Sequence, residues 1–469
     1  MRPDVCFLTH SPTVLVMPTP ASSPRRLRVG TVIEYVLAAG FVVAKVWYAL
    51  RSVLGSGPLG PKVIAGLDSA QYLANAKAPI LSMRFLADRP FGYLLLVKTL
   101  QSNLYAIVIA QTLVSIAAWL FLAATVRRVV HNGVLRTVAV AVVLGMGIAP
   151  PLIIWDVAIM TDSLSISLCC FVLAMALRLA IDMQRRTVVG CCVALVLAAI
   201  TRDSNAILIG VVGIAAAVAT IRRRAWLPIA VVCIAASATV LSLSDRGHRW
   251  YYPTSDVVAL RIEGNPHFEQ YFRNLGLPQD GSVAELHDHF ASAFPDYMRN
   301  APRFRALRHW MDTDGRASYL RFLATHRGFV FSAPLHESSL VNPQFDGVAE
   351  DYGLTPDAVS RVVGAVVFPD IAVLWWVLDV ALALLWVFAV SSGADRRIAG
   401  VLIGFGVLVV PHGLVVFHGD ALEVARHALT LAVHIRVTCW VGTIVVFDTA
   451  LRRLRRPQGA VATNRVGAM

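Results

Sequence analysis

The segment LYAIVIAQTLVSIAAWLFLAATV, residues 104–126, contains no charged side chain and is followed at once by Arg127 and Arg128. A helix needs about 20 apolar residues to cross the hydrocarbon core of a bilayer. Arginines directly after such a run are typical of its cytoplasmic end. The segment therefore predicts a transmembrane helix whose C-terminal end faces the cytoplasm.

Much of the remaining chain has the same character. Its 469 residues are 57% hydrophobic and only 15% charged, too few polar residues to cover the surface of a soluble protein of this size. We therefore predict an all-α polytopic membrane protein with about ten transmembrane helices and the lipid bilayer as its solvent. Helices are expected near 31–50, 104–126, 137–154, 163–181, 187–201, 205–221, 226–243, 371–391, 398–418 and 428–449.

Clusters of arginine separate these runs and fix the expected orientation. With both termini in the cytoplasm, all of the clusters fall on the cytoplasmic face, as the positive-inside rule requires. The net charge of +13 is explained by loops that face anionic lipid, so no nucleic-acid partner is expected. The protein is predicted to be a multi-pass protein of the cell membrane. The clusters are Arg25/Arg26/Arg28, Arg127/Arg128/Arg136, Arg185/Arg186, Arg222/Arg223/Arg224, Arg396/Arg397 and Arg452/Arg453/Arg455/Arg456.

This topology divides the chain into five parts. Residues 1–28 form a disordered cytoplasmic tail, unless the start codon lies further downstream. Residues 29–243 form an N-terminal transmembrane module whose first extracytoplasmic loop is 51–103. A small, mainly helical extracytoplasmic domain follows at 244–370, then C-terminal transmembrane helices at 371–450 and a basic cytoplasmic tail at 451–469.

Ionisable residues of both signs gather at the predicted outer ends of different helices, whereas the cytoplasmic segments carry mostly arginine. This asymmetry predicts a polar cavity that opens outward. Such a cavity suits a reaction between a phosphate-bearing lipid and a hydroxyl group, because cations hold phosphate and a carboxylate accepts the proton. The residues are Asp68, Arg89, Asp156, Asp162, Arg202, Asp203, His418, Asp420, Glu423, Arg426 and His427.

The first outer loop contains two informative segments, Leu67-Asp68-Ser69-Ala70-Gln71-Tyr72 and Asp88-Arg89-Pro90-Phe91-Gly92-Tyr93. This loop resembles that of the GT-C superfamily of polytopic glycosyltransferases, of the protein mannosyltransferase and aminoarabinose transferase type. In that superfamily the loop carries an aspartate before an aromatic-containing helix. The similarity extends to Pro150-Pro151, Trp155-Asp156, Thr161-Asp162-Ser163-Leu164, Thr201-Arg202-Asp203 and the segment 419–427.

The resemblance implies a membrane glycosyltransferase that moves a sugar, with inversion, from a polyprenyl-phosphate donor to an envelope glycan, lipid or protein. Asp68 would be the general base. Asp162 or Asp156 would be a second acid that orients the acceptor or binds a divalent cation, and no cofactor is certain. Candidates for the donor phosphate are Arg89, Arg202, Arg426 and His427, and Tyr72, Asp420 and Glu423 are candidates for support of the site.

Local structure offers another explanation for several of these residues. Asp68 and Asp162 each precede an expected helix and are favoured N-cap residues. Asp420 and Glu423 have the spacing of a capping box. Arg426 and His427 are expected near a helix N-terminus, where the macrodipole disfavours cations, and this placement favours a role with phosphate.

Two other functions remain open at the level of sequence. A transporter or flippase of lipid-linked sugars would carry charges at mid-membrane and broken helices. Candidates for such features are Lys45 in the first helix and Pro411 with His412 in the ninth. A catalytically silent scaffold subunit would lack the aspartate of the first loop, and Asp68 is present.

Overall fold

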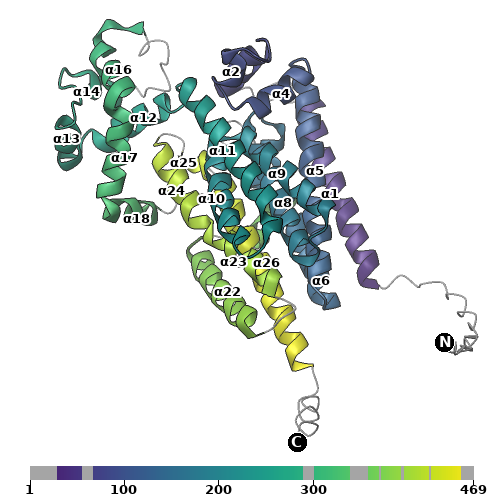
Figure 1. Ribbon diagram of the computed structural model, residues 1–469. Helices are drawn as coiled ribbons and strands as arrows, with labels where there is room; N and C mark the ends of the chain where they lie inside the picture. Colours follow the sequence, from purple (N-terminus) through teal and green to yellow (C-terminus); the bar gives the residue numbers. More distant parts are fainter. Residues whose placement is uncertain are drawn as a thin grey trace, which may run out of the picture.

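The computed structural model describes residues 29–54, 67–288, 300–337, 358–368, 371–391, 396–421 and 424–455. Within these ranges the chain forms helices and no strand (Figure 1), which confirms the all-α prediction. The expected tail 1–28 and most of the expected tail 451–469 lie outside the described residues.

Seven helices of the described residues are long and apolar enough to cross a membrane. An eighth candidate is the pair α6 (Gly133–Ile148) and 150–157, which bends by 53° at Pro150-Pro151. These helices support a multi-pass membrane protein. The seven are α1 (Val29–Leu54), α5 (Leu104–Val129), α8 (Thr161–Ile181), α10 (Asp203–Thr220), the helix 224–246 that contains α11 (Leu227–Arg246), the helix 396–419 that consists of α23 (Arg396–Val407) and α24 (Val409–Gly419), and α26 (Leu429–Leu454). The other two expected ranges form α9 (Arg185–Thr201) and α22 (Ile371–Ser391).

Helix α26 lies at the centre of the bundle, because 89% of its apolar window is buried. It packs against α6, α8, α22, α23 and α24. A second group, formed by α9, α10 and α11, joins the bundle through contacts of α9 with α8. The apolar core between α5, α6, α8 and α26 includes the fully buried Trp119. The described helices therefore form one bundle around a buried C-terminal helix.

Ion pairs tie together the end of the bundle that carries the basic clusters. Glu34 of α1 accepts hydrogen bonds from Arg127 at 2.5 Å and Arg136 at 2.9 Å. The buried Asp448 of α26 accepts from the backbone N–H groups of His131 and Asn132, in the turn between α5 and α6. These contacts gather the start of α1, the α5–α6 turn and the end of α26 at one end.

The opposite end carries three short helices of the first loop, α2 (Leu67–Ala76), α3 (Met83–Leu86) and α4 (Phe91–Thr99) (Figure 1). Two glycines let this loop approach the membrane helices closely. A Cβ on Gly247 would lie 1.9 Å from the carbonyl oxygen of Ala87, and one on Gly92 would lie 2.8 Å from that of Ile200. The loop is therefore held against the ends of α9 and α11.

A helical unit with its own apolar core follows α11, in the green part of Figure 1. The mainly helical character expected for 244–370 is thus found in its described part. The last helix of that range, α21 (Ala358–Val367), packs instead against α6 and 150–153 and joins the core of the bundle. The unit therefore ends before α21, because the apolar face of α21 is buried by Gly145 and Pro150. Its helices are α12 (Tyr251–Val257), a π-helix at Val258–Ile262, α13 (Pro266–Arg273), α14 (Ser282–Asp288), a 3-10 turn at Pro302–Phe304, α16 (Arg305–Trp310), a π-helix at Met311–Gly315, α17 (Arg316–Thr325) and α18 (Arg327–His336).

This unit holds the last turn of α24 at three points. Arg261 donates to the carbonyl oxygen of Phe417, and the Tyr319 hydroxyl donates to that of His418 at 3.0 Å. The His418 ring contacts the carbonyl oxygen of Val330 through Nε2 at 2.9 Å. The chain that leaves α24 toward residue 427 therefore starts from a fixed point.

Candidate active site

A cavity of about 1450 Å³ lies at the end of the bundle that carries α2. Its wall combines α2, the loop before α4, the first turns of α8 and α10, the ends of α11 and α24, residues 419–420 and 426–427, and parts of α12 and α17. Among the residues predicted for the site, Asp68, Tyr72, Arg89, Asp162, Arg202, Asp420, Arg426 and His427 line this cavity.

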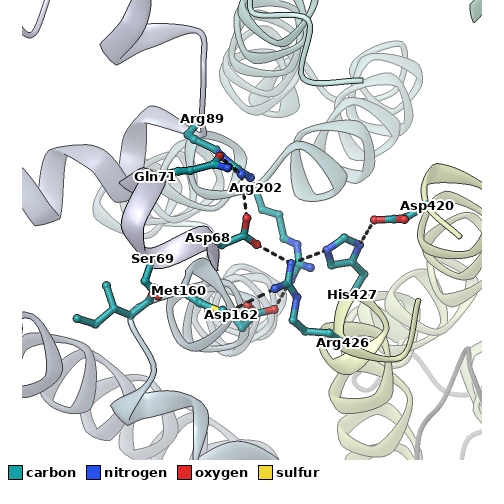
Figure 2. A network of polar contacts seen from close by, with 11 residues as sticks. Asp68, Ser69, Gln71, Arg89, Met160, Asp162, Arg202, Asp420, Arg426 and His427 are labelled. Atoms are coloured by element: carbon teal, nitrogen blue, oxygen red, sulfur yellow. Dashed lines mark hydrogen bonds and ion pairs between the residues drawn. The ribbon is translucent and has the colours of Figure 1, made fainter. Parts of the chain in front are cut away.

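Asp68 lies between two arginines that come from distant parts of the chain (Figure 2). Its Oδ1 accepts from Arg89 Nη2 at 2.8 Å, and its Oδ2 accepts from Arg426 Nη2 at 2.9 Å. Arg89 also donates to Gln71, which stands one turn after Asp68 on α2. The Ser69 hydroxyl donates to the carbonyl oxygen of Ile159 at 2.8 Å and thereby fixes α2 to the segment before α8.

Arg426 continues the network into the segment after α24. It lies 3.1 Å from Nε2 of His427, and His427 Nδ1 lies 3.1 Å from Asp420 Oδ2. Only 9% of the Arg426 side chain is exposed, against 26% for His427. The buried guanidinium is therefore held on one side by Asp68 and on the other by a His–Asp pair.

Asp162 forms a second carboxylate–arginine pair at the start of α8. Its Oδ1 accepts from Arg202 Nη1 at 2.7 Å, and its side chain is 3% exposed. Arg202 precedes α10, so this pair joins the N-terminal ends of α8 and α10. Asp162 and Arg202 lie beside Arg426 in the same network (Figure 2).

Burial and charge act in opposite directions on Asp68. Burial alone would raise the pKa of the Asp68 carboxyl, but the charges of Arg89 and Arg426 outweigh it and hold that pKa below its ordinary value. Burial raises the pKa of the neighbouring Tyr72 phenol. Asp68 is therefore ionised and Tyr72 neutral near pH 7.

Asp156 lies outside this cavity. It forms a buried ion pair with Lys45, with 2.5 Å between Oδ2 and Nζ, and accepts a hydrogen bond from Ser163. The backbone around it is held by Gln111, whose amide donates to the carbonyl oxygen of Ala158 at 2.8 Å. Of the two aspartates considered as second acid, only Asp162 reaches the cavity.

The helix-capping explanations fit only in part. Asp68 and Asp162 occupy the first turns of α2 and α8 and not the N-cap positions. Asp420 Oδ1 does accept from the N–H of Ala421, while Glu423 lies outside the described residues. Arg426 and His427 were expected near a helix N-terminus, but they form the last turn of the short α25 (Val424–His427), because a new helix begins only at Leu429.

Sequence reasoning missed one whole wall of the cavity. This wall starts directly after α11 and contributes Arg249, Trp250, Tyr252, Asp256 and Tyr319. Arg249 is largely buried and lies 3.2 Å from Asp203 of α10, and burial lowers the pKa of its guanidinium. An available signal was the aromatic run Trp250-Tyr251-Tyr252 shortly after the apolar helix α11.

The described residues contain no group of three or more His, Cys, Asp or Glu side chains that could hold a metal ion. Asp68 and Asp162 are each engaged by arginine, and Asp420 is engaged by His427. This donor set does not fit a resident divalent cation, so the proposal below includes no step through one.

The cavity thus brings Asp68, Asp162 and Asp420 together with Arg89, Arg202, Arg426 and His427 at one end of a membrane-type helical bundle. Carboxylates accept protons and guanidinium groups bind phosphate. Comparison of the sequence with protein-family models and with curated proteins finds no match. The functional argument therefore depends on the residues of the cavity and on their chemistry.

Proposed function

We propose that this protein is a membrane glycosyltransferase of the GT-C type, which transfers a sugar from a polyprenyl-phosphate donor to an extracytoplasmic hydroxyl acceptor of the cell envelope. The observation that carries the proposal is the gathering of Asp68, Asp162, Arg89, Arg202 and Arg426 in one cavity. Asp68 and Arg426 are 358 residues apart in the sequence, so chance proximity of neighbours does not explain the cluster.

In the proposed reaction Asp68 accepts the proton of the acceptor hydroxyl while the oxygen of that hydroxyl attacks the anomeric carbon of the donor sugar. The bond between that carbon and the phosphate oxygen breaks, its electron pair stays on the phosphate, and the configuration inverts. Arg89 and Arg426 stabilise the charge that develops on the leaving phosphate. Asp162 orients Arg202, which faces the same space.

The proposed topology has ten transmembrane helices and both termini in the cytoplasm. Its support is the separation of charge along the bundle. The arginines in the last turns of α5 and α26 lie at the end opposite to the cavity, as the positive-inside rule requires if the cavity faces outward. A fluorescent reporter that folds only in the cytoplasm, fused to the C-terminus, is expected to be bright. A dark fusion of normal abundance would contradict this topology.

The reaction is tested with purified protein in nanodiscs and a panel of polyprenyl-phosphate sugars, by following release of polyprenyl phosphate with mass spectrometry. We expect turnover of one donor that is lost in Asp68→Asn. The matched control is Asp182→Asn, an exposed aspartate just after α8 at the other end of the bundle, which should retain turnover. Full turnover in Asp68→Asn would exclude Asp68 as the base.

A transporter of lipid-linked sugars is the second candidate, because ionisable residues lie buried within the spans. Lys45 is 1% exposed, His412 and His434 are 2% and 3% exposed, and their Nδ1 atoms lie 3.2 Å apart. Such groups often mark transport pathways. A transporter would move the intact donor across a liposome membrane without releasing polyprenyl phosphate, and the same mass spectrometry separates the two functions.

A further inference from the structure

The carboxylate of Asp68 already occupies the arginines that a phosphate would use. Each of its oxygens accepts from a different guanidinium group, at 2.8 Å from Arg89 and 2.9 Å from Arg426. The Asp68 side chain is 21% exposed, so the pair is open to the cavity. Charge-assisted bonds of this kind are roughly twice as strong as neutral ones.

The cavity as a whole has no surplus of arginine over aspartate. Six arginines and six aspartates line it, together with three histidines. The arginines are Arg84, Arg89, Arg202, Arg249, Arg316 and Arg426, and the aspartates are Asp68, Asp88, Asp162, Asp203, Asp256 and Asp420. An anionic ligand must therefore compete with carboxylates that are already present.

This arrangement conflicts with a simple role of Asp68 as a base. A carboxylate that accepts two charge-assisted hydrogen bonds has little tendency to take a proton. It gains that tendency when another anion draws the same arginines away, because the opposite charges that favoured its ionised form are then shared. A substrate phosphate is such an anion.

We propose that Asp68 and the substrate phosphate share Arg89 and Arg426, and that negative charge passes from Asp68 to the phosphate across these two arginines during transfer. This inference rests on the proposed function and deepens it, because it makes the strength of the base depend on the donor. Without a phosphate in the cavity, Asp68 stays paired and does not activate an acceptor hydroxyl or a water molecule.

The charges balance at each stage. The donor is a phosphodiester with one negative charge, so together with ionised Asp68 it neutralises the two arginines. In the reaction the acceptor proton moves to Asp68, and the electron pair of the broken carbon–oxygen bond moves to the phosphate. The products are neutral Asp68 and a phosphate monoester with two negative charges, which again neutralise the two arginines.

Other ionisable groups lie near Asp68, and their charges do not change in this scheme. His427 stands beside Arg426 on α25 and is paired with Asp420, and Asp162 is paired with Arg202. The Tyr72 phenol lies on α2 and stays neutral near pH 7. None of these groups needs to exchange a proton with Asp68 for the balance to hold.

The first test measures the affinity of the protein in nanodiscs for farnesyl phosphate, a soluble prenyl phosphate monoester. Asp68→Asn removes the competing charge while keeping the shape of the side chain, so we expect about tenfold tighter binding or more than in the wild type. The matched control is Asp88→Asn, which removes the same charge at an exposed position of the cavity wall. In this control we expect the affinity for farnesyl phosphate to rise by less than about fivefold.

The second test uses only the wild-type protein and does not depend on the folding of a variant. At pH 8 farnesyl phosphate is a dianion, since the second pKa of a phosphate monoester is about 6. We expect its binding to be accompanied by proton uptake, measured by titration calorimetry in buffers of different ionisation enthalpy.

Binding without proton uptake overturns the inference, and so does a gain in Asp68→Asn no larger than that in Asp88→Asn. Loss of the gain when Arg426→Gln is added to Asp68→Asn supports it. The proposed function fails separately, if no donor is turned over or if Asp68→Asn turns over normally. The two results are therefore distinguishable.

Discussion

Lys45 and Asp156 form a buried ion pair that lies outside the cavity. Their Nζ and Oδ2 atoms are 2.5 Å apart, and the side chains are 1% and 5% exposed. Lys45 also donates to Ser115 at 3.0 Å. The pair links α1 to the bent segment that leads into α8 and Asp162.

Replacement of Lys45 by methionine should destabilise the protein strongly. It leaves the buried Asp156 without its counter-charge, a change that costs about 3–5 kcal/mol of unfolding free energy in comparable cases. The double variant Lys45→Met/Asp156→Asn should recover most of this loss, because no uncompensated charge remains. Thermal unfolding in nanodiscs measures both, and equal melting temperatures for wild type and Lys45→Met would contradict the prediction.

The stabilising effect of Asp68 should depend on pH in a defined direction. Its pKa is lower in the folded protein than in the unfolded chain, because Arg89 and Arg426 outweigh the effect of burial. Ionised Asp68 therefore stabilises the fold above its unfolded pKa, and this contribution is lost as pH falls through the folded pKa. The difference in melting temperature between wild type and Asp68→Asn should be largest near neutral pH and shrink on acidification. A difference that grows toward acid would refute this.

Substitution of Arg426 by glutamine should lower kcat by about 100-fold or more, because it removes a donor from the phosphate that gains charge in the transition state. Arg84→Gln is the matched control. Arg84 lines the same cavity but donates to Asn75, and we expect it to retain most activity. A parallel loss in both variants would point to a general effect of cavity charge.

Gly247→Ala should reduce activity at a distance from the reacting groups. The added Cβ would meet the carbonyl oxygen of Ala87 at 1.9 Å, so the backbone two residues before Arg89 must move. Overpacking of this kind costs about 1–3 kcal/mol. Gly404→Ala, in α23 with nothing within 4 Å of the new Cβ, is the control and should leave stability unchanged or slightly raised. Wild-type turnover in Gly247→Ala would show that the loop position does not matter.

The helices were largely predictable because the signal for each one is local. A run of apolar residues is enough to define a segment such as 104–126, and the described helices occupy all ten expected ranges. The boundary of the helical unit that follows α11 was not predictable in this way. The apolar residues of α21 would suit a helix of that unit as well as a helix of the bundle. Only the contact of α21 with Gly145 and Pro150 assigns it to the bundle.

The residues of the site were largely predictable from the sequence, but the ion pairs between them were not. Asp68, Arg89 and Arg426 were candidates because ionisable residues at outer helix ends converge, but which carboxylate meets which arginine depends on tertiary structure. Asp156 was a candidate for the same reason, and the Lys45 side chain in the middle of α1 removes it from the cavity. Arg249 and Trp250 belong to a long polar segment without periodicity, where the aromatic run 250–252 was an available signal but did not show which residues reach the cavity.

The attachment of the helical unit after α11 to the last turn of α24 links the site to residues far from the cavity. Arg261, Tyr319 and Val330 each form a hydrogen bond with Phe417 or His418. The chain then continues to Asp420, Arg426 and His427. We therefore expect a molecule that displaces α17 or α18 to shift the end of α24 and to alter the spacing of the charged groups beyond it. Under the proposed function, we expect a ligand bound to the surface of this unit to change turnover without entering the cavity, because the unit is attached to the helix that leads toward Arg426.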